Sequence, residues 1–158
     1  MKLAELISAN DIFPESDKRF QSKNKWDVIA SCTQLFLTSK GMPKLIEHAN
    51  DILVEREKSM STGIGEGVAI PHATSDQIDQ PLVAFFTFPS GIDFESVDGK
   101  PTFILVSMLV PKNQLQKQIL ALSAIARMGL NNKLKEEILK SSDPEFIWSL
   151  IYESEKVK

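Results

Sequence analysis

Two apolar segments bounded by prolines constrain the fold of this chain most strongly. The first covers residues 82–88 between Pro81 and Pro89, and the second covers residues 102–110 ahead of Pro111. Runs of this length without regular polar alternation are typical of strands that are buried on both faces. The two runs therefore predict a sheet that helices cover on both sides.

Helical patterns surround these two runs. A short opening helix is expected at 3–7, and apolar residues recur at helical spacing in further segments. These segments are 26–36, 43–56, 115–126, 133–140 and 143–151. In segment 115–126 the spacing predicts a buried stripe that contains Leu115, Ile119 and Leu122. The chain has 158 residues, which suits one domain. We expect a single α/β domain over residues 1–158, with a small sheet between helices.

The composition argues against several classes of protein. The formal charge is −3 and the basic residues are spread along the chain, unlike those of a nucleic-acid-binding protein. The single cysteine, Cys32, lies in an apolar helical pattern that predicts a buried, inert thiol. One cysteine and two histidines are too few for a metal cluster. No signal peptide is visible and no apolar run approaches the roughly 20 residues of a membrane span. We expect a cytoplasmic domain without membrane insertion.

Residues 61–67 contain three of the seven glycines. This density predicts tight turns and backbone amides that can face a ligand. The spacing is not that of a nucleotide-binding P-loop, because the required lysine is missing, and not that of a dinucleotide-binding turn. The segment instead leads into a short predicted strand at 68–70, which we expect Pro71 to end.

His72 follows this proline and is the candidate for chemistry. A neutral imidazole is nucleophilic near pH 7 because its unperturbed pKa is about 6.5. A phosphoryl group carries roughly two negative charges, so a site that receives one needs a few donors. Arg56, in line with the apolar face of its predicted helix, and the hydroxyls of Ser61 and Thr62 are suitable donors. Backbone amides would come from Gly63, Gly65 and Gly67.

From these residues alone, other interpretations stay open. A histidine after a strand is more often structural, and the glycines could serve only as turn formers. A Ser-His-Asp hydrolase would use Asp76 or Asp79, but the chain has no G-x-S-x-G nucleophile elbow. His48 stands beside Glu47 on a predicted helix and is most simply a solvated surface residue.

A longer pattern around the histidine matches a known family. It resembles the active-site signature of fructose/mannitol-type IIA domains of the bacterial phosphoenolpyruvate-dependent phosphotransferase system. The pattern is Glu55-Arg56-Glu57 followed by Ser61-Thr62-Gly63-Ile64-Gly65-Glu66-Gly67-Val68-Ala69-Ile70-Pro71-His72-Ala73. Residues 92–94, 98–101 and 109–111 are also similar, so the resemblance covers most of the chain. Within the family, the chain is most similar to the nitrogen-regulatory IIA subgroup, whose members stand alone as single domains.

The resemblance implies a fold, a reaction and a partner. The family fold is a mixed β-sheet flanked by helices. The family histidine accepts a phosphoryl group from phosphorylated HPr or its nitrogen-branch counterpart, and this role falls on His72. The family arginine corresponds to Arg56, and the hydroxyl before the first glycine corresponds to Thr62. Neither a metal nor a dissociable cofactor is implied.

The chain departs from the family pattern at one position. The family commonly has a second active-site histidine early in the helix after the last strand, and Gln118 stands in its place. The predicted stripe places Gln118 at the border of the buried face, so we expect it to point inward. Its amide can donate a hydrogen bond, but it cannot be protonated near pH 7.

These features support a phosphoryl-carrier protein with a regulatory output. His72 would receive the group from an HPr-type phosphocarrier, and a regulatory target protein or a transporter IIB component would be the next partner. One alternative is a sugar-specific IIA subunit that works with separate membrane components. A second alternative, which Gln118 motivates, is a binding regulator that kept the fold without efficient transfer.

Overall fold

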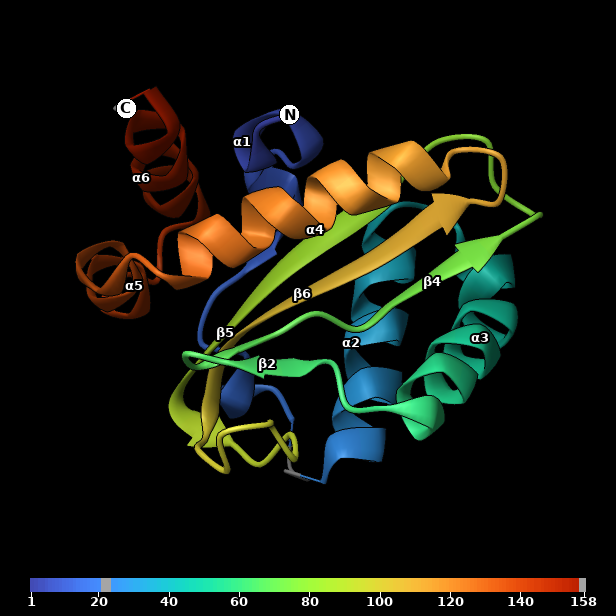
Figure 1. Ribbon diagram of the computed structural model, residues 1–158, viewed down its shortest axis with the longest axis horizontal. Helices are drawn as coiled ribbons and strands as arrows, with labels where there is room; N and C mark the ends of the chain where they lie inside the picture. Colours follow the sequence, from blue (N-terminus) through green and yellow to red (C-terminus); the bar gives the residue numbers. More distant parts are fainter. Residues whose placement is uncertain (21–23, 157–158) are drawn as a thin grey trace.

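The computed structural model describes residues 1–20 and 24–156 (Figure 1). The helices are α1 (Leu3–Leu6), α2 (Lys25–Ser39), α3 (Ile46–Ser59), α4 (Leu115–Gly129), α5 (Asn132–Leu139) and α6 (Pro144–Lys156). Short 3-10 turns occupy Ala9–Asp11, Ser16–Lys18 and Pro43–Leu45. The strands are β1 (Ile12–Phe13), β2 (Gly63–Gly65), β3 (Val68–Ala69), β4 (His72–Ser75), β5 (Leu82–Ile92) and β6 (Thr102–Pro111).

The strands form one mixed sheet around the two predicted apolar runs. The order is β1-β5-β6-β3-β2, and β4 pairs with β6 further along that strand. β5 and β6 are antiparallel, whereas β1 runs parallel to β5, and β3 and β4 run parallel to β6. β5 continues past the exposed Pro89, where its pairing with β6 is irregular, as is typical of a proline at a bulge. The predicted α/β class with a small mixed sheet is confirmed.

Pro71 lies between two strands, because β3 ends at Ala69 and β4 begins at His72, so the expected strand end before this proline is confirmed. Val68 pairs with Ile104 and His72 pairs with Met108, which means that β3 and β4 keep one register along β6. Proline lacks an N–H but keeps its carbonyl. The Pro71 carbonyl accepts a hydrogen bond from the Met108 amide at 2.9 Å. His72 therefore begins a strand and takes a fixed position on the sheet.

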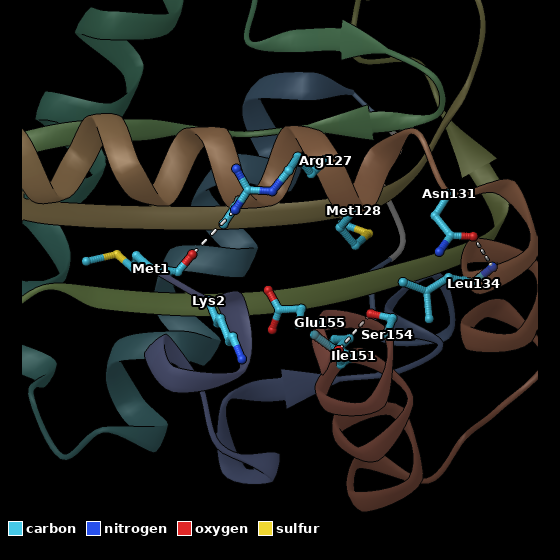
Figure 2. A pocket seen from close by; sticks show the side chains of 10 residues that line it. Met1, Lys2, Arg127, Met128, Asn131, Leu134, Ile151, Ser154 and Glu155 are labelled. Carbon is cyan, nitrogen blue, oxygen red and sulfur yellow. Dashed lines mark hydrogen bonds between the residues drawn. The ribbon is translucent and has the colours of Figure 1, made fainter. Parts of the chain in front are cut away.

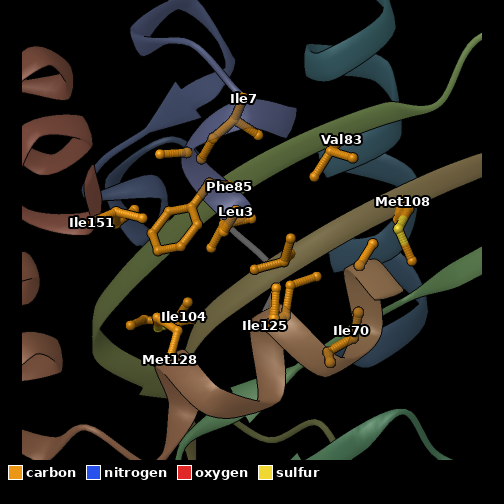
Figure 3. Close-up of a cluster of buried hydrophobic side chains, with 14 of the residues drawn as sticks. Leu3, Ile7, Ile70, Val83, Phe85, Ile104, Met108, Ile125, Met128 and Ile151 are labelled. Atoms are coloured by element: carbon orange, nitrogen blue, oxygen red, sulfur yellow. The ribbon is translucent and has the colours of Figure 1, made fainter. Parts of the chain in front are cut away.

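Two hydrophobic clusters cover opposite faces of the sheet. Successive residues of β5 separate them, because Val83 and Phe85 belong to one cluster and Ala84 and Phe86 to the other. The first cluster includes residues of α1, α4 and α6 (Figure 3) and also residues of α5. The second includes residues of α2 and α3, on the other side of the sheet (Figure 1). Helices on both faces are thus confirmed.

Cys32 lies in the second cluster and is 1% exposed. Burial raises the pKa of its thiol well above the ordinary value. The thiol is therefore held in its neutral, unreactive form, in agreement with the prediction of a buried cysteine.

The buried face of α4 differs from the predicted stripe. Leu115 is 55% exposed and Ile119 is 67% exposed. The helix instead packs on the sheet through Ala121, Ala124, Ile125 and Met128. Apolar residues occur on two sides of this helix, so periodicity alone did not identify the inner side. The small alanines allow a close approach to the sheet.

The N-terminal residues meet the end of α6 beside α4. The carboxylate of Glu155 accepts hydrogen bonds from the amides of Leu3 at 2.6 Å and Ala4 at 2.8 Å. Arg127 Nη2 donates to the Met1 carbonyl at 3.4 Å. A pocket lies at this place, and Figure 2 shows its lining residues. Its volume is about 440 Å³, and the predicted site residues do not line it. Within residues 1–20 and 24–156, none of the helices has the length and apolar character needed to span a membrane.

Candidate functional site

His72 is the first residue of β4, a strand that pairs with β6 and packs against α3. Its ring atom Nδ1 lies 2.6 Å from the carbonyl oxygen of Ile70. A carbonyl oxygen only accepts hydrogen bonds, so Nδ1 carries the proton in this contact. In the neutral ring the other nitrogen, Nε2, then has a free lone pair. The contact with the Ile70 carbonyl thus selects which nitrogen can act as a nucleophile.

A pocket of about 340 Å³ brings three predicted site residues together. Arg56 comes from α3, His72 from β4 and Gln118 from α4. These residues are far apart in the sequence but meet where β4 lies between the end of α3 and the start of α4. The pocket also contains Ile52, Glu55, Ala73 and Thr74.

Arg56 is half-buried near the end of α3. Its Nη1 atom donates to the Met60 carbonyl at 2.9 Å, which closes the last turn of the helix. This bond uses one of the five N–H groups of the guanidinium. Arg56 therefore lines the pocket with donors left for an anion.

Gln118 points into the pocket even though the predicted stripe of α4 was wrong. It lies one helical turn before Ala121, on the side of α4 that faces the sheet. Its Oε1 atom is buried and has no hydrogen-bond partner among the described residues. An unpaired buried acceptor is costly, and a 180° rotation of the amide would present two donors in its place. The inward orientation of Gln118 agrees with the expectation.

Burial lowers the pKa of His72 below its ordinary value of 6.5. The hydrogen bond to the Ile70 carbonyl and the charge of Glu57 raise this pKa, while the charge of Arg56 lowers it. Burial is the largest of these effects. The ring is therefore neutral at pH 7, as a nucleophile requires.

The two hydroxyls before the glycines have structural partners. Thr62 is 3% exposed, and its hydroxyl and amide both donate to the Glu57 carboxylate. Ser61 Oγ donates to the Phe94 carbonyl at 3.0 Å and accepts from the Gly63 amide at 3.1 Å. Neither residue lines the His72 pocket. Their roles as phosphate ligands stay predictions.

The glycines serve the backbone geometry and lie outside the lining of this pocket. A side chain at Gly63 would clash with Ser96, and Gly65 and Gly67 have φ of +89° and +75°. The turn at Gly67 lines a separate pocket beside α5, where Lys135 donates to the Glu66 carbonyl. The contribution of these glycines to phosphate binding also stays a prediction.

Thr74 is a pocket residue that the sequence analysis missed. It is half-buried two residues after His72, so both side chains extend from the same face of β4. Its hydroxyl makes no hydrogen bond to another described residue. The signal would be the alternation of side chains along β4, a four-residue strand that the sequence did not predict.

His48 is a half-buried network residue, which corrects its interpretation as a solvated surface residue. Its Nε2 lies 2.7 Å from Ser75 Oγ, and its Nδ1 lies 3.2 Å from Gln77 Nε2. An amide nitrogen only donates, so Nδ1 accepts and Nε2 carries the proton. His48 thus connects α3 to the end of β4 by hydrogen bonds. Across residues 1–20 and 24–156, three or more histidine, cysteine, aspartate or glutamate side chains do not converge on a point where a metal ion could be held.

The match to a family model extends over residues 5–154. This model is described as "Phosphoenolpyruvate-dependent sugar phosphotransferase system, EIIA 2". The chain therefore belongs to the EIIA 2 family of the phosphotransferase system, in agreement with the sequence resemblance.

The relatives come from both the sugar and the nitrogen branches. A "PTS system fructose-specific EIIA component" of Haloferax volcanii is 35% identical over 105 residues, which cover 66% of this chain and 68% of the relative. A "Nitrogen regulatory protein" of Bradyrhizobium diazoefficiens is 26% identical over 151 residues, which cover 96% of this chain and 95% of the relative. The crystal structure of the nitrogen regulatory protein IIA-Ntr from Neisseria meningitidis has the same fold, with a TM-score of 0.82 and 24% identity over 94% of this chain and 98% of that chain.

Proposed function

We propose that this protein is a phosphoryl carrier that receives a phosphoryl group on Nε2 of His72. The observation that carries the proposal is the bond from His72 Nδ1 to the Ile70 carbonyl, which leaves Nε2 as the free nitrogen of a neutral ring. Membership of the EIIA 2 family supports the same reaction class. The working compartment would be the cytoplasm.

In the proposed reaction, Nε2 attacks the phosphorus atom of a phosphohistidine on an HPr-type phosphocarrier. The new N–P bond forms as the donor's N–P bond breaks in line, and the donor nitrogen leaves with the electron pair. The His72 ring acquires positive charge during this step. The Ile70 carbonyl, which already accepts from Nδ1–H, stabilises that charge.

Side chains around the pocket would hold the transferred group. Arg56 supplies positive charge and donors, and Gln118 and Thr74 supply neutral donors from α4 and β4. A charge-assisted hydrogen bond contributes about 1.5–3 kcal/mol and a neutral one about 1 kcal/mol. One cation with two neutral donors would bind the phosphoryl group without trapping it, because onward transfer requires a labile bond.

The surface around the pocket suits a protein donor. At the start of α4 the apolar side chains Leu115, Ile119 and Leu120 are exposed next to Gln118. Apolar side chains beside a reactive group are typical of a docking surface for a protein partner. We assign the phosphocarrier to this surface, and a regulatory target or a transporter IIB component to the next step.

We favour a regulatory output, in which phosphorylation of His72 changes the proteins that the chain binds. The similarity to nitrogen regulatory proteins along almost the whole chain supports this output. The similarity to a fructose-specific EIIA component supports a sugar-specific subunit as the alternative. Gln118 favours a second candidate function, a binding regulator that transfers slowly, because the pocket lacks a second ionisable ring.

A labelling experiment tests the proposal. The protein is incubated with phosphoenolpyruvate, enzyme I and an HPr-type carrier, and its intact mass is measured for an acid-labile phosphoryl group. We expect one group on the wild type and on His48→Asn, and none on His72→Asn. A wild type that stays unlabelled would contradict the carrier function, and a labelled His72→Asn protein would contradict the site.

A further inference from the structure

A buried cluster of charged and polar residues adjoins Arg56, and the proposed reaction gives this cluster no role. We call it the Glu57 cluster, and it consists of Lys25, Glu57 and Thr62, which are 5%, 2% and 3% exposed. Lys25 is the first residue of α2, Glu57 belongs to the last turn of α3, and Thr62 immediately precedes β2. Three separate segments of the chain therefore meet at one carboxylate.

Both oxygens of this carboxylate are occupied. Oε2 lies 2.9 Å from Lys25 Nζ and 2.7 Å from the Thr62 amide, and Oε1 accepts from the Thr62 hydroxyl. Lys25 Nζ also lies 5.3 Å from the ring centre of Trp26 and 5.1 Å from that of Phe94. A buried ion pair is a weak source of stability, but its directional bonds fix the groups that make them. The cluster therefore holds the three chain segments that meet at Glu57 in a defined arrangement.

Two further hydrogen bonds connect the Glu57 cluster to the reactive ring. The Thr62 carbonyl accepts from the Ile70 amide at 2.9 Å, and the Ile70 carbonyl accepts from His72 Nδ1 at 2.6 Å. On its other side, Glu57 directly follows Arg56 on α3. The carboxylate is thus linked to the helix end that carries the arginine and to the segment that leads to the histidine.

We propose that Glu57 is a positioning residue, which fixes Arg56 and His72 relative to one another through its bonds to Lys25 and Thr62. The proposal rests on the phosphoryl-transfer function given above. Glu57 is buried and does not line the His72 pocket, so it does not touch the phosphoryl group. Glu57 instead controls the distance between Arg56 and His72 and keeps the ring proton of His72 on Nδ1.

The variant Glu57→Gln tests this role in the full-length protein. An amide offers one acceptor oxygen in place of two, so the Thr62 hydroxyl can no longer donate to Oε1 and could only accept from the new amide nitrogen. Lys25 also loses the negative charge that it pairs with. We expect the saturating rate of phosphorylation to fall about 10- to 100-fold, as a small misplacement of reacting groups would cause. The carrier concentration for half-maximal rate should change by less than about twofold, because binding to the carrier surface is intact.

Nuclear magnetic resonance of the imidazole nitrogens provides a second readout without any phosphorylation. In Glu57→Gln the pKa of His72 should fall further, because a negative charge that raises it is gone. The fraction of the ring with its proton on Nδ1 should also fall. Asp51→Asn, which removes an exposed acid from the same helix, should leave both quantities unchanged.

The double variant Lys25→Met/Glu57→Gln distinguishes an effect on the geometry of the site from a loss of protein stability. Removing both charges avoids an unpaired buried lysine, so this variant should unfold at a higher temperature than Glu57→Gln. Its phosphorylation rate should stay low and the proton of His72 should stay shifted away from Nδ1, because the carboxylate that accepts from both the Thr62 amide and the Thr62 hydroxyl is still missing. A double variant with the wild-type rate and the wild-type Nδ1 proton would overturn the proposal. A wild type without any labelling would instead contradict the carrier function, and the nitrogen spectra would then decide the role of Glu57 alone.

Discussion

The Nδ1 atom of His72 lies 2.6 Å from the carbonyl oxygen of Ile70, two residues earlier in the chain. This contact assigns the ring proton to Nδ1 and leaves Nε2 as the nucleophile. We predict that the phosphorylated protein carries its group on Nε2. Phosphorus–nitrogen coupling in ¹⁵N-histidine-labelled protein distinguishes the two isomers. The isomer phosphorylated on Nδ1 would show that the Ile70 contact breaks before transfer.

The lowered pKa of His72 predicts the pH dependence of the reaction. The rate of phosphorylation should be constant above pH 6.5, the ordinary pKa of histidine, and should fall only below it, as the lowered pKa is reached. Single-turnover rates across this range, with a carrier phosphorylated beforehand, measure the effect. A rate that already declines between pH 8 and about pH 7 would contradict a lowered pKa.

The same shift links His72 to stability. Between the lowered pKa of the folded protein and 6.5, the unfolded chain binds a proton that the folded protein does not. Stability should therefore fall as the pH drops through this window, with no contribution from His72 above it. Urea unfolding of the wild type and of His72→Asn should show this part of the pH dependence only in the wild type.

Arg56 has two expected effects on the site. In Arg56→Gln we predict a loss of phosphorylation rate of about 10- to 100-fold, because a charge-assisted bond of about 1.5–3 kcal/mol to the phosphoryl group is lost. The pKa of His72 should rise, since the arginine charge lowers it. Lys58→Gln removes an exposed charge two residues away and is the matched control. Equal rates in the two variants would exclude Arg56 from the transfer step.

By the sequence resemblance, Gln118 corresponds to the position of a second family histidine. In Gln118→His we expect phosphorylation about 3- to 10-fold faster, because a cationic donor holds a phosphoryl group more strongly than an amide. Gln118→Leu should react more slowly than the wild type. Gln34→His places a new ring on the exposed side of α2, away from the pocket, and should have no effect. If Gln118→Leu and Gln118→His both label at the same rate as the wild type, the amide takes no part in transfer.

The sequence predicted the layers of the fold well because they depend on long patterns. The runs at 82–88 and 102–110 became the central strands β5 and β6, with helices on both faces. The inner face of α4 was wrong because leucine and isoleucine occupy both sides of this helix, and only contact with the sheet selects the alanine side. The strand β4 was not predicted, because it is short and follows Pro71, and only its pairing with β6 keeps it in register with β3.

The candidate site was predictable in part. Arg56, His72 and Gln118 meet in one pocket, as the family signature implies. Thr62 and the glycines are equally prominent in that signature, but their polar groups hold the backbone in place. A signature records which residues are required and not whether they bind a ligand or shape the loop. Thr74 lies outside any recognisable motif and became visible only through its place on β4.

Transfer from a phosphorylated carrier tests the central claim most directly. An HPr-type carrier is phosphorylated, freed of enzyme I and phosphoenolpyruvate, and mixed with an equal amount of this protein while phosphorus NMR follows both phosphohistidines. The account predicts that the carrier signal decays as a new Nε2-phosphohistidine signal appears, and that His72→Asn leaves the carrier signal unchanged. A carrier that binds the wild type and keeps its phosphoryl group would contradict the account and would identify a binding regulator.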